Sequence, residues 1–165
     1  MATRTKTTER EVDIPCGRRR LSGILRVPPG ADGVVAFAHG SGSGRFSPRN
    51  QFVARALEEG GLATLLLDLL EEDEARDREK VFDVELLAER LQSAADWLRQ
   101  EPETATLRLG YFGASTGAGA ALVAAARDPA AAWRDRSGWR WRDGTRRWRP
   151  SPRAPRPAAG RTSRR

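Results

Sequence analysis

The chain has 165 residues, enough for one domain with a sizeable core, and a net charge of +7 that is unevenly distributed. Residues 131–165 hold twelve arginines and two aspartates, a charge of +10, which leaves −3 on residues 1–130. The single cysteine, Cys16, excludes an internal disulfide, and no apolar run is long enough for a signal peptide or a membrane span. We therefore expect a cytoplasmic protein that does not enter a membrane.

The first elements of the chain have the patterns of strands. Residues 1–10 are polar and charged, and we expect them to be disordered before a domain that covers residues 11–130. Short strands are expected over residues 11–15 and 21–28. A run of five apolar residues over 34–38 is typical of a strand that is covered on both faces.

A helix and a second buried strand follow. Ser47 has the character of an N-cap and Pro48 that of a first helical residue, while Gly60 and Gly61 should end the helix. The strand comes next, over residues 62–67. The helical spacing predicts an apolar face made of Phe52, Val53, Ala56 and Leu57.

The middle of the chain predicts one long helix after a charged segment. Residues 71–80 are dense in charge, and we interpret them as a solvated loop or first helical turn rather than as a binding site. An amphipathic helix is expected over residues 84–98, with a strand over 107–112 and a helix over 115–128 after it. The stripe of the long helix consists of Val84, Leu87, Leu91, Ala94 and Leu98.

This order of elements predicts an α/β protein. Buried strands that alternate with helices give right-handed crossovers, a mostly parallel sheet and helices on both of its faces, which together make three layers.

The most informative motif is Gly113-Ala114-Ser115-Thr116-Gly117, between an expected strand and an expected helix. A Gly-x-Ser-x-Gly in this context is typical of a nucleophile elbow, a sharp turn that exposes the serine hydroxyl at the edge of the sheet. The alternative is an ordinary tight turn.

A second glycine-rich loop, residues 39–44, follows the earlier buried strand. In an elbow-type hydrolase the oxyanion would be bound by the amide of Thr116 and by one amide of this earlier loop, for which we choose Ser41. Phosphate binding is the competing interpretation. The loop lacks the lysine of a P-loop, and its glycines do not have dinucleotide-binding spacing.

These motifs resemble the α/β-hydrolase superfamily, in particular its dienelactone-hydrolase-like branch, over residues 11–128. The resemblance implies a Ser115 nucleophile, oxyanion donors at Ser41 and Thr116, and an ester, thioester or lactone as a small-molecule substrate. No metal or organic cofactor is expected, since one histidine and one cysteine cannot make a closed set of metal ligands. The residues that the resemblance gives a loop-shaping role are His39, Gly40, Gly113 and Gly117.

The chain departs from that family after the elbow helix. The only histidine is His39, which we expect to be structural, and the later carboxylates Asp128, Asp135 and Asp143 are not credible triad acids. We therefore expect a fold whose C-terminal half is missing and which is nearly inactive alone. Completion of a split enzyme by another chain is the alternative.

Residues 131–165 change in character abruptly. They contain four tryptophans and four prolines, but no Val, Ile, Leu, Met or Phe, and we expect this tail to be disordered. One interpretation is translation out of frame; another is a basic tail that binds nucleic acid through arginine and tryptophan. The tail would then make the protein a nucleic-acid-binding or scaffold protein rather than a hydrolase. The sequence does not predict an oligomeric state.

Overall fold

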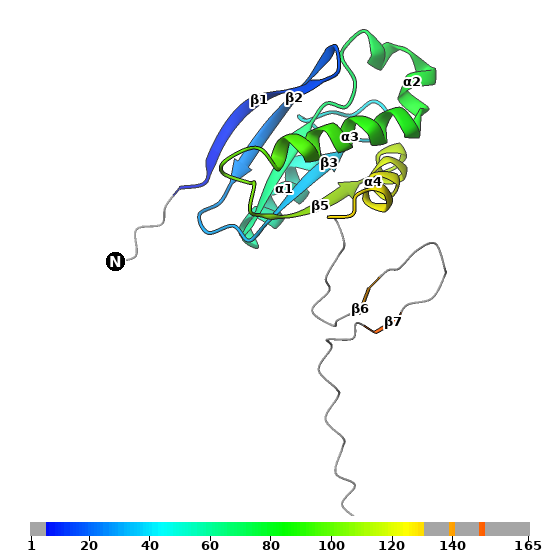
Figure 1. Cartoon of the computed structure of the whole chain (residues 1–165). Helices are drawn as coiled ribbons and strands as arrows, with labels where there is room; N and C mark the ends of the chain where they lie inside the picture. Colours follow the sequence, from blue (N-terminus) through cyan, green and yellow to red (C-terminus); the bar gives the residue numbers. More distant parts are fainter. Residues whose placement is uncertain (1–5, 131–138, 141–148, 151–165) are drawn as a thin grey trace, which may run out of the picture. The chain divides into compact units, whose positions relative to one another are not determined.

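A computed structural model describes residues 6–130, 139–140 and 149–150 of the chain, which divides into two compact units, residues 1–131 and 132–165. The first unit carries the candidate site (Figure 1). Its elements are, in chain order, β1 (Thr8–Cys16), β2 (Arg19–Val27), β3 (Gly33–Ala38), α1 (Pro48–Glu59), β4 (Leu62–Leu67), the 3-10 helix η1 (Glu74–Arg76), α2 (Arg78–Phe82), α3 (Val84–Leu98), β5 (Arg108–Gly113) and α4 (Thr116–Arg127).

The five strands form one mixed sheet in the order β1-β2-β4-β3-β5. β3 pairs in parallel with both β4 and β5, whereas β2 is antiparallel to its neighbours β1 and β4. β2 is therefore the one strand of this sheet that runs against the other four. The prediction of an α/β fold is confirmed.

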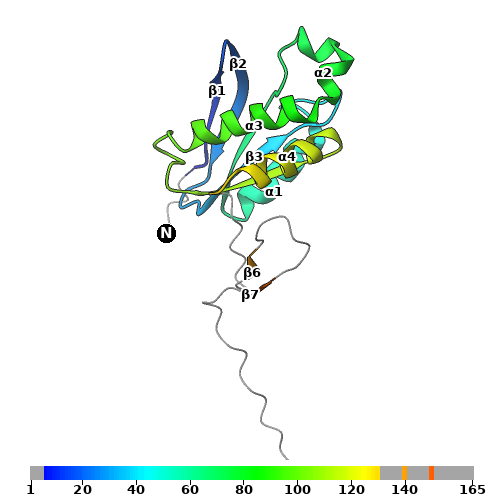
Figure 2. The same cartoon turned by 45° about the vertical axis from the view of Figure 1, so that its right-hand side comes forward.

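Helices cover both faces of the sheet, as the two views show (Figures 1 and 2). Successive residues of a strand point to opposite faces. Accordingly, Leu65 and Leu67 join the core beneath α3 and α4, while Leu66 packs with Phe37 and Ala54 on the α1 side. These two apolar clusters make the three-layer arrangement that the sequence predicts.

The side of α1 that faces the sheet differs from the predicted one. Ser47 and Pro48 do begin the helix, although the Ser47 side chain makes no capping hydrogen bond. The prediction that Phe52 and Ala56 lie on the apolar face is wrong, because Phe52 is 72% exposed and Ala56 is exposed. The packed stripe is offset by one position and consists of Asn50, Val53, Ala54 and Leu57.

The charged segment 71–80 is more structured than expected. It forms η1 and most of α2, and Glu74 within it is buried. The prediction of a wholly solvated segment is therefore wrong at Glu74. The stripe of α3, by contrast, is confirmed at Leu87, Leu91, Ala94 and Leu98, which are all buried.

One carboxylate fastens the end of α4 to the rest of the unit. The Asp128 side chain accepts hydrogen bonds from the Tyr111 hydroxyl at 2.6 Å, from the Ala130 amide at 2.9 Å and from the Arg99 guanidinium. Burial alone would raise the pKa of Asp128, but the bonds from Tyr111 and Arg99 outweigh it and lower this pKa. We call this arrangement the Asp128 clasp.

β5 is an edge strand of the sheet. Among the described residues, no helix is long and apolar enough to cross a bilayer. The expected disorder of residues 1–10 is wrong for Thr8–Arg10, which belong to β1; residues 1–5 lie outside the described ranges.

The second unit is described only at four residues. β6 (Trp139–Arg140) pairs antiparallel with β7 (Arg149–Pro150), which the sequence does not predict because two residues are too few for a strand pattern. The expected disorder of the rest of the tail falls on residues outside the described ranges.

Candidate active site

Ser115 lies at the sharp turn between the end of β5 and the start of α4. Its backbone has φ 57° and ψ −128°, and it is the only residue other than glycine with a positive φ in the described part of the chain. Its side chain is exposed and makes no capping bond to the helix. The strained backbone therefore leaves the hydroxyl free at the protein surface.

Two glycines make this turn sterically feasible. A Cβ atom on Gly117 would lie 2.1 Å from the Ala38 carbonyl oxygen, and one on Gly113 would lie 2.1 Å from the Gly117 carbonyl oxygen. No side chain fits at such distances. The motif thus has glycine where α4 crosses directly over the ends of β3 and β5.

The loop of residues 39–44 reaches the same corner of the molecule. A Cβ atom on Gly40 would lie 3.0 Å from the Ala114 carbonyl oxygen and 3.2 Å from the Cβ of Ser115. The two glycine-rich motifs, 75 residues apart at Gly40 and Ser115, are therefore in contact.

Both ring nitrogens of His39 form hydrogen bonds with backbone groups. Its Nε2 accepts a hydrogen bond from the Leu69 amide at 2.9 Å, so the ring proton is on Nδ1, which donates to the Gly40 carbonyl oxygen at 3.0 Å. The side chain is buried. This imidazole has no free lone pair with which to accept a proton from Ser115.

Several backbone amides at the corner have no acceptor among the described residues, and those of Ser41 and Thr116 are among them. A cavity of about 140 Å³ adjoins them, between the loop and the helical layer. One wall is backbone and small side chains of residues 39–43. The apolar wall is formed by Leu70, Ala75, Val81 and Leu87, and Thr116 also lines the cavity.

The Thr116 side chain adds one polar atom at this place. Its Oγ1 is buried and has no hydrogen-bond partner in the described part of the chain. Together with the two amides, it makes the corner rich in unused donors.

Asp68, directly after β4, fixes the far end of the loop. Its carboxylate accepts the Arg45 amide at 2.6 Å and pairs with the Arg45 guanidinium, which lies 4.4 Å above the Phe46 ring. These groups border a second, wider cavity of about 660 Å³ that also touches His39 and Ser43. The loop is thus held at both ends, by His39 and by Asp68.

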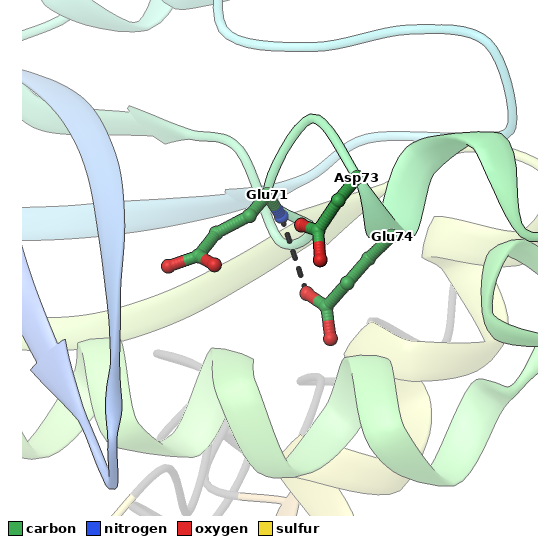
Figure 3. A group of neighbouring side chains, drawn as sticks. All are labelled: Glu71, Asp73 and Glu74. Carbon is green, nitrogen blue, oxygen red and sulfur yellow. Dashed lines mark hydrogen bonds between the residues drawn. The ribbon is translucent and has the colours of Figure 1, made fainter.

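Three carboxylates, Glu71, Asp73 and Glu74, lie close to one another (Figure 3), and Glu71 also lines this cavity. The cations that they meet are side chains: Arg19 contacts all three, and Glu74 is also paired with Arg90 and Lys80. The cluster is therefore explained by ion pairs, and we assign no metal to it.

Glu74 and Arg90 form a buried ion pair within this cluster. The side chains of Glu74 and Arg90 are only 3% and 7% exposed. The hydrogen bond from Arg90 lowers the pKa of Glu74 to about 2, against an opposing effect of burial.

Sequence analysis missed this pair, although a weak signal exists. Arg90 lies at helical spacing within the apolar stripe, between Leu87 and Leu91. A charge on such a stripe requires a buried partner, but which of the nearby acidic residues supplies it depends on the tertiary fold.

Comparisons with known proteins support the fold. No family model matches the chain. A dienelactone hydrolase from Anabaena variabilis is 53% identical with a TM-score of 0.73, over 76% of this chain and 60% of that one. A cold-adapted esterase from an Arctic intertidal metagenomic library has a TM-score of 0.64 at 18% identity, over 76% of this chain and 58% of its own, a likeness of fold alone.

Two curated Mycobacterium tuberculosis proteins, one from strain H37Rv and one from strain CDC 1551, are 56% identical to 121 residues of this chain. Both carry a provisional name as phosphoribosyl transferases. The match covers 73% of this chain but spans only about a quarter (27%) of the length of these relatives. The architecture and its similarity to solved hydrolases identify the first unit as an α/β-hydrolase fold of the dienelactone-hydrolase-like kind.

Proposed function

We propose that this unit has the nucleophile and oxyanion site of a serine hydrolase, with Ser115 as the nucleophile. The observation that supports this most is the contact of the exposed, strained Ser115 with Gly40 of the second glycine-rich loop. That contact brings a free hydroxyl next to two amides without acceptors.

The proposed reaction is acyl transfer to water. The Ser115 oxygen attacks the carbonyl carbon of an ester, thioester or lactone, while its proton passes to a base. The amides of Ser41 and Thr116 donate to the developing oxyanion. The intermediate then expels the protonated alcohol or thiol, and water hydrolyses the acyl-serine to release the acid and restore Ser115.

The base is not among the groups described at this corner. The chain has one histidine, and His39 is occupied at both nitrogens. We infer that a histidine and its carboxylate are supplied by another chain, as in a split enzyme. Without them turnover should be lower by about a million-fold, the loss typical when a triad serine or histidine is removed.

The volume and the apolar lining of the small cavity support a short acyl group as the part of the substrate that binds there. Its volume of about 140 Å³ is similar to that of a cavity that holds one benzene ring. Leu70, Val81 and Leu87 give it an apolar wall. The dienelactone hydrolase relative makes a lactone of this size a reasonable substrate class.

Chemical rescue tests this proposal. The purified chain is incubated with p-nitrophenyl acetate, with and without added imidazole, and acetylated peptides are quantified by mass spectrometry. Imidazole replaces the missing base, so we expect it to accelerate acetylation of Ser115. Ser115→Ala should lose the labelled peptide.

Ser41→Ala is the matched control, because it removes a hydroxyl from the same corner but keeps the amide that the proposal uses. It should be acetylated at Ser115 like the unchanged chain. Equal acetylation of surface residues, with no preference for Ser115, would contradict the proposal.

A further inference from the structure

We propose that the buried Glu74–Arg90 ion pair positions the Ser41 amide, acting through Leu69 and His39, so that both are positioning residues for oxyanion binding. The inference rests on the proposed function, but it concerns residues on η1 and α3 that do not line the small cavity. It is carried by an unbroken series of hydrogen bonds.

The first step joins α3 to the end of β4. Arg90 donates to both Glu74 oxygens, Nη2 to Oε1 at 2.7 Å and Nη1 to Oε2 at 2.5 Å. Nη1 also donates to the Leu69 carbonyl oxygen at 2.7 Å. One guanidinium is thus held in a fixed orientation by the carboxylate and in turn fixes the Leu69 carbonyl.

The Glu74 carboxylate is itself fixed from several sides. It accepts the Glu71 amide at 3.3 Å, the dashed contact in Figure 3, and it faces Arg19 and Lys80 at 3.3 and 3.4 Å. A buried ion pair is weak support for stability in itself, and the role proposed for this one is to hold its partners in a fixed orientation.

The second step joins Leu69 to His39. Leu69 is fully buried, and its amide donates to His39 Nε2 at 2.9 Å. Since its carbonyl is held by Arg90, both backbone groups of this residue are engaged. The imidazole is therefore aligned by a residue whose own position depends on the ion pair.

The third step joins His39 to Ser41. The Gly40 carbonyl oxygen accepts from His39 Nδ1 at 3.0 Å and from the Ser43 amide at 3.2 Å. This carbonyl and the Ser41 N–H belong to one planar trans peptide and point in opposite directions. Fixing the carbonyl toward His39 consequently directs the Ser41 N–H away from it.

The test uses the single histidine, whose imidazole 15N signals need no assignment. In the unchanged full chain we expect one tautomer, protonated at Nδ1, and a slowly exchanging His39 ring proton. Glu74→Gln should release Arg90 and Leu69, giving mixed tautomers and ring-proton exchange at least about tenfold faster. Glu72→Gln is the matched control, because Glu72 is exposed and, among the residues that the structure describes, pairs with Arg76 alone.

A second readout separates positioning from general stability. Imidazole-assisted acetylation of Ser115 should be about 10- to 100-fold slower in Glu74→Gln. The maximal rate should fall, while the ester concentration that gives half of this rate should stay the same. The NMR readout needs no activity, so failure of the proposed function would leave it intact.

Two results would overturn the inference. One is an Nε2-protonated His39 in the unchanged chain. The other is a folded Glu74→Gln chain with the tautomer and ring-proton exchange of the control. If Glu74→Gln does not fold, the Glu74→Gln/Arg90→Met chain replaces it, since removal of both buried charges is better tolerated than removal of one, and the same shifts are expected.

Discussion

At the scale of single residues, Ser115 combines an unfavourable backbone with a free side chain. A φ of 57° with a ψ of −128° belongs to a region that glycine adopts easily and other residues do not. Ser115→Gly should therefore stabilise the unit relative to Ser115→Ala, by about 1–2 kcal/mol. Urea unfolding of both variants measures this difference.

The comparison of these two variants removes the hydroxyl in both, so it isolates the backbone. Equal unfolding free energies would show that the turn is not strained. A more stable Ser115→Gly would show that the backbone at this position is strained, as is often seen at functional sites.

Gly117 gives a second prediction at this scale. Its added Cβ would overlap the Ala38 carbonyl oxygen at 2.1 Å, so Gly117→Ala should cost about 3 kcal/mol or more. Gly119→Ala, in the same helix, first meets the Val84 methyl groups at 3.3 and 3.4 Å rather than backbone, and should change stability by less than about 1 kcal/mol. Thermal unfolding compares them, and equal melting temperatures would contradict the close crossing.

The sequence predicts the residues of the elbow well because their roles are local. A strand, a Gly-x-Ser-x-Gly and a helix lie within about twenty residues, and glycine is required by the turn itself. Glu74 and Arg90 could not be predicted as a pair, because their meeting depends on how η1 packs against α3.

At the scale of elements, the Glu74 carboxylate joins η1 to α3 through its ion pair with Arg90. The free energy of unfolding should therefore change with pH as this carboxylate titrates. Its pKa of about 2 in the folded chain lies below the ordinary 4.5, so the charged carboxylate favours the folded state. This contribution is complete above pH 4.5 and is lost as the pH falls toward 2. Its size should approach about 3 kcal/mol.

Unfolding measured between pH 6 and pH 2.5 tests this. Other carboxylates titrate in the same range, so the informative quantity is the difference between the unchanged chain and Glu74→Gln. That difference should shrink as the pH falls, whereas Glu72→Gln should follow the unchanged chain throughout. A difference that does not depend on pH would contradict the assignment.

The apolar periodicity of the sequence predicts where a helix lies better than it predicts which of its sides packs against the sheet. The apolar stripe of α3 is long enough to fix its orientation. In α1 the apolar residues Phe52, Val53, Ala56 and Leu57 allow more than one face, and packing on Phe37 and Leu66 selects the side that contains Ala54. The small α2 and η1 escape prediction because their charged sequence has no apolar pattern.

At the scale of the whole molecule, the edge strand β5 predicts association. Its outer side has no partner strand in the described sheet, and such edges pair readily with other chains. We expect residues 1–130, produced alone, to have an apparent mass in sedimentation that rises with concentration. A monomer that melts sharply at all concentrations would contradict this.

The arginine-rich residues 131–165 predict a salt-dependent affinity for single-stranded nucleic acid. With a charge of +10 and four tryptophans, binding should weaken steeply as salt increases, because each neutralised phosphate releases counterions. Residues 1–130, at −3, provide the control and should not bind. An affinity that ignores salt would contradict an electrostatic role.

The Asp128 clasp has a practical consequence for the layout of the unit. α4 begins at Thr116, directly after Ser115, and runs back along β5 for about 18 Å, so the clasp lies toward the opposite edge of the sheet, where β5 begins. β1 runs parallel to β5, which puts Thr8 at that same edge. A reporter protein or solid support attached before Thr8 or after Ala130 would therefore leave the approach to Ser115 unobstructed.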